Sequence, residues 1–377
     1  MKFNSNELLN SLNKVSAIVS DKSVVEQLRS YHFLPDVEKG EVRIAGSDSI
    51  MTLIQRVPFV ATEDSDGTHL EISADKLTDI IKYAGPEVEF VYTEGEENEE
   101  VNIITPRSKV VLRKHFGNNE ELIDFDIENV TDFDDEMEVG QFKEILSRLG
   151  SLIDSNNIDP AAKTIFFDKE RAIVGDSISL SIMDMVTNES YEFNIKVVRM
   201  ILSLLNSENV ESKVKLKKYE EDGMILVKTD NSIFRFSIAD VYPHDLELIN
   251  TFEATTSVLV SKEEFIQGLH LVKATSEEDK VSITIRKSEK DGIQGEVALE
   301  SYFEGENSSD VIGCSRGMFN DPEKETLKFE SLVSLIVKLT NVIDNEGVVV
   351  AIDTESSVLF VREPRKKIIS AISVALI

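Results

Sequence analysis

The side chains most able to do chemistry are six of the carboxylates crowded into residues 124–136. They are Asp124, Asp126, Asp132, Asp134, Asp135 and Glu136. Carboxylate oxygens bind Mg²⁺, and a bound Mg²⁺ could assist phosphoryl transfer, so a magnesium-dependent enzyme is one hypothesis. The same composition is typical of a solvated acidic linker. Because the stretch lies between two predicted domains, we favour the linker interpretation.

Other catalytic patterns are missing from the sequence. It contains no glycine-rich phosphate loop, no H-E-x-x-H and no G-x-S-x-G, and its five histidines lack metal-ligand spacing. Cys314 is the only cysteine, and no histidine is placed to activate it. We therefore predict a protein that is not an enzyme and needs no cofactor or metal. Any ATP used in its cycle would be hydrolysed by a partner.

The composition sets the broad class. A chain of 377 residues exceeds what one hydrophobic core usually supports, so two or three domains are expected. The sequence shows no leader and no apolar run near the ~18 residues of a membrane span, and a single cysteine fits a reducing compartment. We expect a cytoplasmic protein without membrane contact. A formal charge of −30 argues against nucleic-acid binding unless the basic residues gather in one place.

An internal repeat organises the chain. A short extended segment, a polar residue suited to cap a helix, and a helix with one apolar stripe recur six times. Neighbouring copies lie 56 to 69 residues apart, counted between the first apolar residues of the helices. These residues are Leu8, Leu77, Phe142, Val198, Phe265 and Leu332. Serines occupy four of the expected N-cap positions: Ser5, Ser73, Ser261 and Ser331.

Alternating and β-branched segments between the helices predict several strands after each helix. Pairing the six copies gives an α+β fold of three tandem domains, each with two helices packed on antiparallel sheet. We place the domains at residues 1–130, 131–253 and 254–377. The first boundary falls in the acidic stretch.

With these features the chain resembles the bacterial DNA polymerase III β sliding clamp, a processivity factor, over its whole length. Local similarities are Met1-Lys2-Phe3, Gly46-Ser47-Asp48, Val174-Gly175-Asp176 and Tyr242-Pro243. The sequence departs from the family at 175–180 and in the tail 373–377, which is typical of a divergent and possibly phage-encoded member. The resemblance implies three DNA-clamp domains that form a ring as a head-to-tail homodimer.

Such a ring would bring twelve helices to its inner wall. At spacings of ~9.5 Å they would enclose a hole of roughly 25 Å, wide enough for a DNA duplex. The segments 6–29, 74–84, 141–153, 195–205, 262–274 and 331–343 together carry a net charge of +4, which leaves −34 for the rest of the chain. The candidate residues for sequence-independent binding of double-stranded DNA are Lys14, Lys22, Arg29, Lys76, Lys82, Arg148, Lys196, Arg199 and Lys338.

The resemblance also implies two protein interfaces. A pocket for short apolar peptides of replication proteins is expected at Ile178, Leu180, Pro243, Leu246, Leu248, Ile372, Val374 and Ile377. Dimer contacts are expected between a basic strand and an acidic one, at Arg107, Lys109, Glu300, Tyr302 and Glu304. The implied partners are a replicative DNA polymerase and a clamp loader ATPase.

The sequence therefore predicts a DNA sliding clamp that tethers the replicative polymerase for processive synthesis. Two alternatives remain. One is a magnesium-dependent DNA-processing enzyme that uses the cluster Asp124 to Glu136, and the other is a β-rich scaffold without DNA contact. Circular DNA incubated with Mg²⁺ distinguishes them, because an enzyme cuts it, a clamp is retained on it and a scaffold ignores it.

Overall fold

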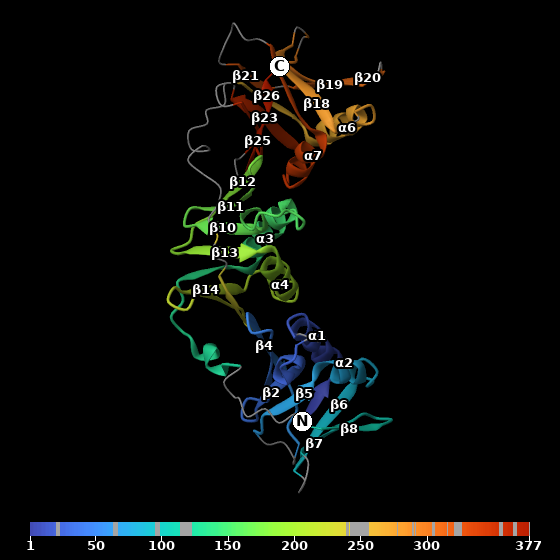
Figure 1. The fold of residues 1–377 in the computed structure, drawn as a ribbon, viewed down its shortest axis with the longest axis vertical. Helices are drawn as coiled ribbons and strands as arrows, with labels where there is room; N and C mark the ends of the chain where they lie inside the picture. Colours follow the sequence, from blue (N-terminus) through green and yellow to red (C-terminus); the bar gives the residue numbers. More distant parts are fainter. Residues whose placement is uncertain are drawn as a thin grey trace. The chain divides into compact units, whose positions relative to one another are not determined.

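The structure is a computed structural model. It describes residues 1–19, 23–62, 67–94, 99–113, 123–238, 241, 256–276, 278–288, 290, 292–303, 306–314, 316–319, 326–353, 357–364 and 368–376. Figure 1 shows the course of the chain, which divides into two compact units. The first comprises Met1–Lys143 and Lys196–Ile238, and the second comprises Glu144–Ile195 and Ala239–Ile377.

Six α-helices are described, one in each copy of the sequence repeat. They are α1 (Ser5–Ser16), α2 (Ala74–Lys82), α3 (Val139–Leu152), α4 (Ile195–Leu205), α6 (Lys262–Lys273) and α7 (Val333–Asn341). Short 3₁₀ turns are η1 (Glu26–Arg29), η3 (Phe125–Asn129) and η4 (Ala161–Lys163). Each helix turns an apolar stripe to its sheet, as Leu8, Leu12 and Val15 do in α1.

The first unit contains two antiparallel sheets. The larger has the order β5-β2-β3-β4-β16-β15-β14-β9, and the smaller has the order β1-β6-β7-β8. The strands are β1 (Lys2–Asn4), β2 (Ser30–Asp36), β3 (Glu41–Ser47), β4 (Met51–Pro58), β5 (Leu70–Ser73), β6 (Glu87–Glu94), β7 (Glu99–Ile104), β8 (Lys109–Arg113), β9 (Asp135–Glu138), β14 (Lys213–Tyr219), β15 (Met224–Lys228) and β16 (Ser232–Ser237).

The second unit repeats this plan with the sheet orders β13-β10-β11-β12-β25-β24-β23-β17-β21 and β20-β19-β18-β22-β26. Its strands are β10 (Thr164–Asp168), β11 (Arg171–Gly175), β12 (Ser179–Asp184), β13 (Ser190–Asn194), β17 (Thr256–Ser261), β18 (Lys280–Lys287), β19 (Gly295–Phe303), β20 (Glu306–Cys314), β21 (Arg316–Phe319), β22 (Thr326–Leu332), β23 (Gly347–Asp353), β24 (Val358–Arg362), β25 (Ile368–Ser373) and β26 (Ala375–Leu376).

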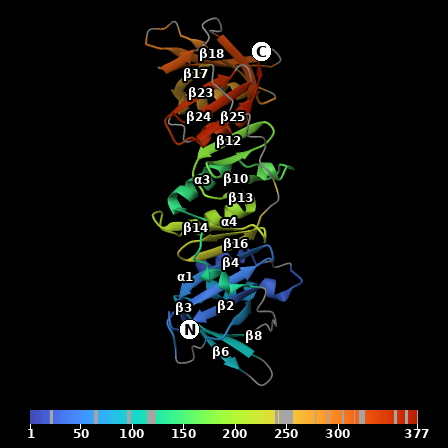
Figure 2. The ribbon, with the colours of Figure 1, turned by 90° about the vertical axis from the view of Figure 1, so that its left-hand side faces the viewer.

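The predicted α+β class is confirmed, with the helices on antiparallel sheet. Each large sheet also joins strands from two of the predicted domains, since β4 pairs with β16 and β12 pairs with β25 (Figure 2). The three domain boundaries themselves stay a prediction. No helix among the described residues is both long and apolar enough to cross a membrane.

Two of the four predicted helix caps are wrong. Asn4, not Ser5, caps α1, because the Asn4 Oδ1 accepts the Asn6 and Glu7 N–H groups at 3.0 and 3.2 Å. Leu332 stands at the cap of α7, one residue after Ser331. Ser73 and Ser261 do hold the N-cap positions of α2 and α6, but only the Ser261 hydroxyl accepts a helix N–H group, that of Glu264. Asn is as good an N-cap as Ser, so type alone could not choose between neighbours.

Candidate functional site

Four of the candidate DNA-binding cations lie exposed on helical elements of the first unit. Arg29 ends η1, Lys76 lies in the first turn of α2, Lys82 ends α2, and Arg199 is in α4. The Lys82 Nζ lies 5.6 Å from the centre of the exposed Tyr83 ring, a cation–π distance. Exposed cations on helices can reach a polyanion without breaking internal contacts.

Lys196 is exposed and also has a partner. It opens α4, and its Nζ lies 3.4 Å from the Asp48 carboxylate in the turn between β3 and β4. The Lys196 side chain keeps 69% of its surface exposed. An exposed ion pair of this kind is weak, so the ammonium can exchange Asp48 for a phosphate at little cost.

Two other candidates, Lys14 and Lys338, are held by contacts within their own unit. Lys14 donates to the Ser207 Oγ at 2.6 Å, and burial lowers the pKa of Lys14, an effect that the nearby Glu208 carboxylate partly offsets. Lys338 of α7 donates to the Leu152 carbonyl at the end of α3 at 2.6 Å. A cation there satisfies a terminal helix carbonyl and the helix dipole. Lys22 lies outside the described residues.

Arg148 is the most enclosed of the candidates. Its guanidinium contacts Glu363 at 2.9 Å, Glu144 at 3.4 Å and Asp344 at 3.5 Å. The side chain of Arg148 is only 12% exposed and that of Glu363 only 5%. The arginine therefore joins α3 to the end of β24 and to the loop after α7, which gives it a structural role that the sequence did not reveal.

The predicted partner pocket gathers around β12 and the tail strand β25 in the second unit. The Ser373 N–H donates to the Ile178 carbonyl at 3.0 Å, which ties the tail to the β11–β12 turn. Ile178 is 52% exposed and Leu180 is half-buried, whereas Ile372 and Val374 are buried. Among the described members, Ile178 and Leu180 offer the apolar surface. Four predicted members lie outside the described residues: Pro243, Leu246, Leu248 and Ile377.

The β11–β12 turn has a defined local cause. The Asp176 Oδ1 accepts the N–H groups of Ile178 and Ser179 at 2.9 and 2.8 Å, which closes the turn. A Cβ placed on Gly175 would lie 2.5 Å from the Leu180 Cδ1, so only glycine lets Leu180 lie over this backbone. The turn thereby sets the position of the two apolar side chains.

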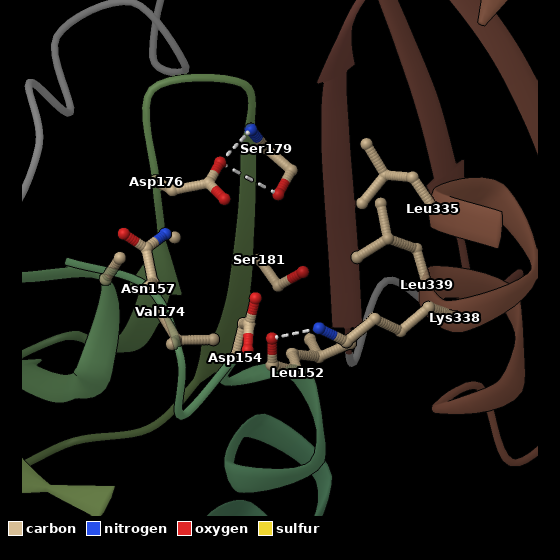
Figure 3. A pocket seen from close by; sticks show the side chains of 12 residues that line it. Leu152, Asp154, Asn157, Val174, Asp176, Ser179, Ser181, Leu335, Lys338 and Leu339 are labelled. Atoms are coloured by element: carbon tan, nitrogen blue, oxygen red, sulfur yellow. Dashed lines mark hydrogen bonds between the residues drawn. The ribbon is translucent and has the colours of Figure 1, made fainter. Parts of the chain in front are cut away.

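A small pocket of about 50 Å³ lies on the α7 side of the same hairpin (Figure 3). Leu335 and Leu339 of α7 face it, and the Lys338 ammonium reaches across to Leu152. The predicted partner residues that the structure describes do not line it. Its size suits a water or an ion rather than a peptide side chain.

The predicted dimer contacts fall on or next to two sheet ends. In the part of the chain that the structure describes, β8 ends the four-stranded sheet and β20 ends the five-stranded one. Lys109 is in β8 and Arg107 precedes it, both exposed. Glu300 and Tyr302 lie on β19, one strand in from the edge, and Glu304 is outside the described residues. The sequence missed the acidic residues of the end strand itself, Glu306 and Asp310.

Four carboxylates of the acidic stretch contact basic side chains. Asp124 pairs with Arg235 at 3.3 Å, Asp132 and Asp134 pair with Lys217 at 3.0 and 3.3 Å, and Glu136 pairs with Lys215 at 3.5 Å. Among the described residues, no group of three or more acidic, histidine or cysteine side chains could hold a metal ion. Such pairing fits a structural linker.

The remaining candidate chemical groups are enclosed. Cys314 is buried, and burial raises the pKa of its thiol, so little reactive thiolate forms near neutral pH. The His32 Nε2 donates to the Gln27 carbonyl at 3.0 Å, and burial lowers the pKa of His32 to about 4. The structure assigns neither residue a chemical role.

Comparison with known proteins places the fold. No protein-family model matches the chain, and no curated protein matches it. Solved structures match over the full length. The DNA polymerase III subunit beta from Pseudomonas aeruginosa is 14% identical with a TM-score of 0.79, and the match covers 100% of both chains.

Two further structures give the same result. The DNA polymerase sliding clamp from Bacillus subtilis is 14% identical with a TM-score of 0.78, covering 99% of this chain and 98% of that one. The Helicobacter pylori beta clamp bound to a DNA ligase peptide is 16% identical with a TM-score of 0.75, covering 100% and 99%. Over its whole length, the chain thus has the fold of the bacterial β sliding clamps.

Proposed function

We propose that this chain is a DNA sliding clamp that encircles duplex DNA as a head-to-tail dimer, catalyses no reaction and tethers a replicative polymerase. The observation that supports the proposal most is a repeated junction between sheets. In the first unit β4 pairs with β16, and in the second unit β12 pairs with β25. In each case the third strand after one helix joins the third strand after another.

Among the strands that the structure describes, the repeat leaves one junction incomplete. The third strands after the six helices are β4, β8, β12, β16, β20 and β25. Four of them are used in the two junctions, which leaves β8 and β20. Exposed strand edges invite pairing with another chain. Two different edges on each copy make a head-to-tail contact, and such contacts generate a closed ring when the rotation closes.

The internal junctions also predict the register of the third. In both junctions, the first residue of one strand pairs with the residue four positions after the one whose carbonyl closes the turn before the other strand. Met51 of β4 thus pairs with Phe236 of β16, whose turn is closed by Ser232. Ser179 of β12 pairs with Ile372 of β25, whose turn is closed by Ile368. In β8 the turn-closing residue is Ser108, since Thr105 N–H donates to its carbonyl at 2.8 Å.

Applied to β8 and β20, this rule places Glu306, the first residue of β20, opposite Leu112, which lies four residues after Ser108. Because the two strands would be antiparallel, Ser309 then lies opposite Lys109. Within its own chain Ser309 pairs with Glu300, so Lys109 and Glu300 share one cross-strand row. The same register puts Val111 in a row with Asn307 and Tyr302, which would cover two exposed apolar side chains. These rows support the predicted contacts of Lys109, Glu300 and Tyr302.

DNA would meet the helix side of the ring. The exposed cations Arg29, Lys76, Lys82, Lys196 and Arg199 contribute charge there without base contacts, which suits sliding. We assign Lys14, Arg148 and Lys338 a smaller share, because each ammonium or guanidinium is already bound within the protein.

Partner peptides would bind at the β12 and β25 surface. Ile178 and Leu180 supply apolar area there, next to the buried Ile372 and Val374 of the tail. The peptide-bound Helicobacter pylori clamp shows that a protein of this fold accepts such a ligand. A polymerase and a loader ATPase are the partners that this function requires.

A covalent trap tests the ring without a loader. Ser309→Cys with Lys109→Cys would place cysteines at about 5 Å between Cα atoms, within disulfide range. The native Cys314 is buried and does not compete. After oxidation in the presence of nicked circular DNA, we expect a protein–DNA complex that survives detergent and is released when the circle is cut.

The matched control pairs Ser309→Cys with Arg113→Cys, four residues and about 13 Å further along β8. It should give neither covalent dimer nor retention. Cutting of the circle with Mg²⁺ would favour the enzyme alternative, and absence of a detergent-resistant complex after efficient cross-linking would contradict the clamp.

A further inference from the structure

A basic surface lies on the face of the eight-stranded sheet that points away from α1. Six cationic side chains from five neighbouring strands share this face: Arg43, Arg56, Lys215, Lys217, Lys228 and Arg235. Arg43 lies directly opposite Arg56, and Lys215 lies directly opposite Lys228. Like charges in directly opposed positions destabilise a sheet, so this surface requires counter-charge.

Residues 123–134, which we call the outer strap, supply that charge. The Glu128 carboxylate bridges the opposed arginines, contacting Arg43 at 2.9 Å and also pairing with Arg56. Lys228 donates to the Glu128 and Val130 carbonyls at 2.7 and 3.4 Å. At the end of the strap Asp132 and Asp134 engage Lys217, and at its beginning Asp124 engages Arg235.

Apolar contacts hold the same segment in place. Ile123 and Ile127 of the strap are buried against Ala45 and Ile54 of the sheet. The Phe133 ring centre lies 5.8 Å from the Lys215 Nζ and 5.6 Å from the Lys228 Nζ. Figure 1 shows the strap, with its short η3 turn, on the side of this sheet opposite α1. Charge and packing together cover the basic face.

We propose that the outer strap is a built-in mask: it occupies a basic sheet face that would otherwise bind duplex DNA, and so confines DNA to the helix side. Six cations spread over five strands, each about 4.8 Å from the next, span roughly 20 Å, comparable to a duplex. Strap carboxylates take the places that backbone phosphates would take. Duplex DNA is chosen as the competing polyanion because the proposed function brings it close to this surface.

Three charge-neutralising substitutions in the strap test the mask: Asp124→Asn, Asp132→Asn and Asp134→Asn. They release Lys217 and Arg235 and leave the buried isoleucines in place. Binding of a labelled linear 30-base-pair duplex, without loader, is measured by fluorescence anisotropy at low and moderate salt. We expect the strap variant to bind about tenfold more tightly than wild type at low salt, with the gain shrinking as salt rises.

The control must change net charge equally without touching the strap. Glu170→Gln, Asp184→Asn and Glu346→Gln are exposed positions in the second unit and serve this purpose. An equal gain in this control would overturn the proposal in favour of a net-charge effect. The proposal would also be overturned if the strap variant bound the duplex no more tightly than wild type. The same holds if the tighter binding persisted after Lys217→Ser and Arg235→Ser were added to the strap variant.

A second variant keeps the test valid if the triple variant fails to fold. If the triple variant melts well below wild type, Asp132→Asn alone makes the comparison, since its side chain is 93% exposed and its loss cannot unfold the sheet. About a twofold gain that Lys217→Ser removes would support the mask, and no gain would overturn it. The short linear duplex lets any ring slip off, so this result is independent of whether the covalent trap closes.

Discussion

At the scale of single residues, the structure separates cations that hold the protein together from cations that face solvent. Arg148 and Arg199 look alike in the sequence, since each is a basic residue within a predicted helix that has one apolar stripe. In the structure Arg148 is enclosed by three carboxylates, whereas Arg199 is exposed. Their substitution should therefore affect different properties.

Arg148→Ala should lower the free energy of unfolding by about 3 kcal/mol, because it leaves the buried Glu363 carboxylate without its cation. Arg199→Ala should change it by less than about 0.5 kcal/mol. Urea unfolding of both variants measures the difference. If the two variants unfold at the same urea concentration, the structural role assigned to Arg148 is wrong.

His32 should make stability depend on pH in a defined window. Burial lowers its pKa from 6.5 to about 4, so between these values the unfolded chain binds a proton that the folded protein does not. The stabilisation is complete above pH 6.5, declines as pH falls toward 4, and levels off below. The total is at most about 3 kcal/mol.

Urea unfolding midpoints at pH 7.5 and pH 5 measure this effect, with His32→Gln as the comparison. The variant should lose less stability than wild type between the two pH values, because Gln does not titrate. Identical losses would mean that other groups, the acidic ion pairs among them, account for the whole acid dependence.

At the scale of helices and strands, much was predictable from period alone. The six helices follow from apolar residues three or four apart, and each one appears near its predicted place. Strand order was not predictable, because pairing partners such as β12 and β25 are far apart in the chain. The sequence predicts the acidic side of the dimer interface at Glu300, which lies on β19. Among the described strands, however, the one at the end of this sheet is β20. A sequence does not show which of two strands has no outer neighbour.

The predicted row of Lys109 and Glu300 leads to a charge-swap experiment on the sheet edges. Lys109→Glu should weaken the dimer about tenfold by placing like charges in one row. Adding Glu300→Lys should restore the affinity, because the pair is then reversed. Sedimentation over a concentration series reports the shift toward monomer. Lys76→Glu, a matched reversal on α2, should leave the dimer unchanged. A dimer that tolerates Lys109→Glu would exclude the proposed register.

At the scale of the whole molecule, the net charge of −30 and the proposed DNA contact are compatible because charge is unevenly distributed. The helical segments are weakly basic, and the strap neutralises the basic face on the other side of the large sheet. Sequence arithmetic predicted the first point. It could not predict the second, since the strap's partners come from strands far away in the chain.

Topological retention and electrostatic attraction should therefore respond differently to the exposed cations. Lys76→Ala with Arg199→Ala, in the Ser309→Cys and Lys109→Cys background, should lower the amount of protein trapped on circular DNA. Capture depends on attraction before closure, and each lost phosphate contact weakens it.

Once the ring is closed, the lifetime on the circle at about 1 M salt should equal that of the unsubstituted trap, because charges farther apart than the roughly 3 Å Debye length are screened there. A shortened lifetime at high salt would mean that these cations grip the duplex rather than guide it, and a ring that grips could not slide.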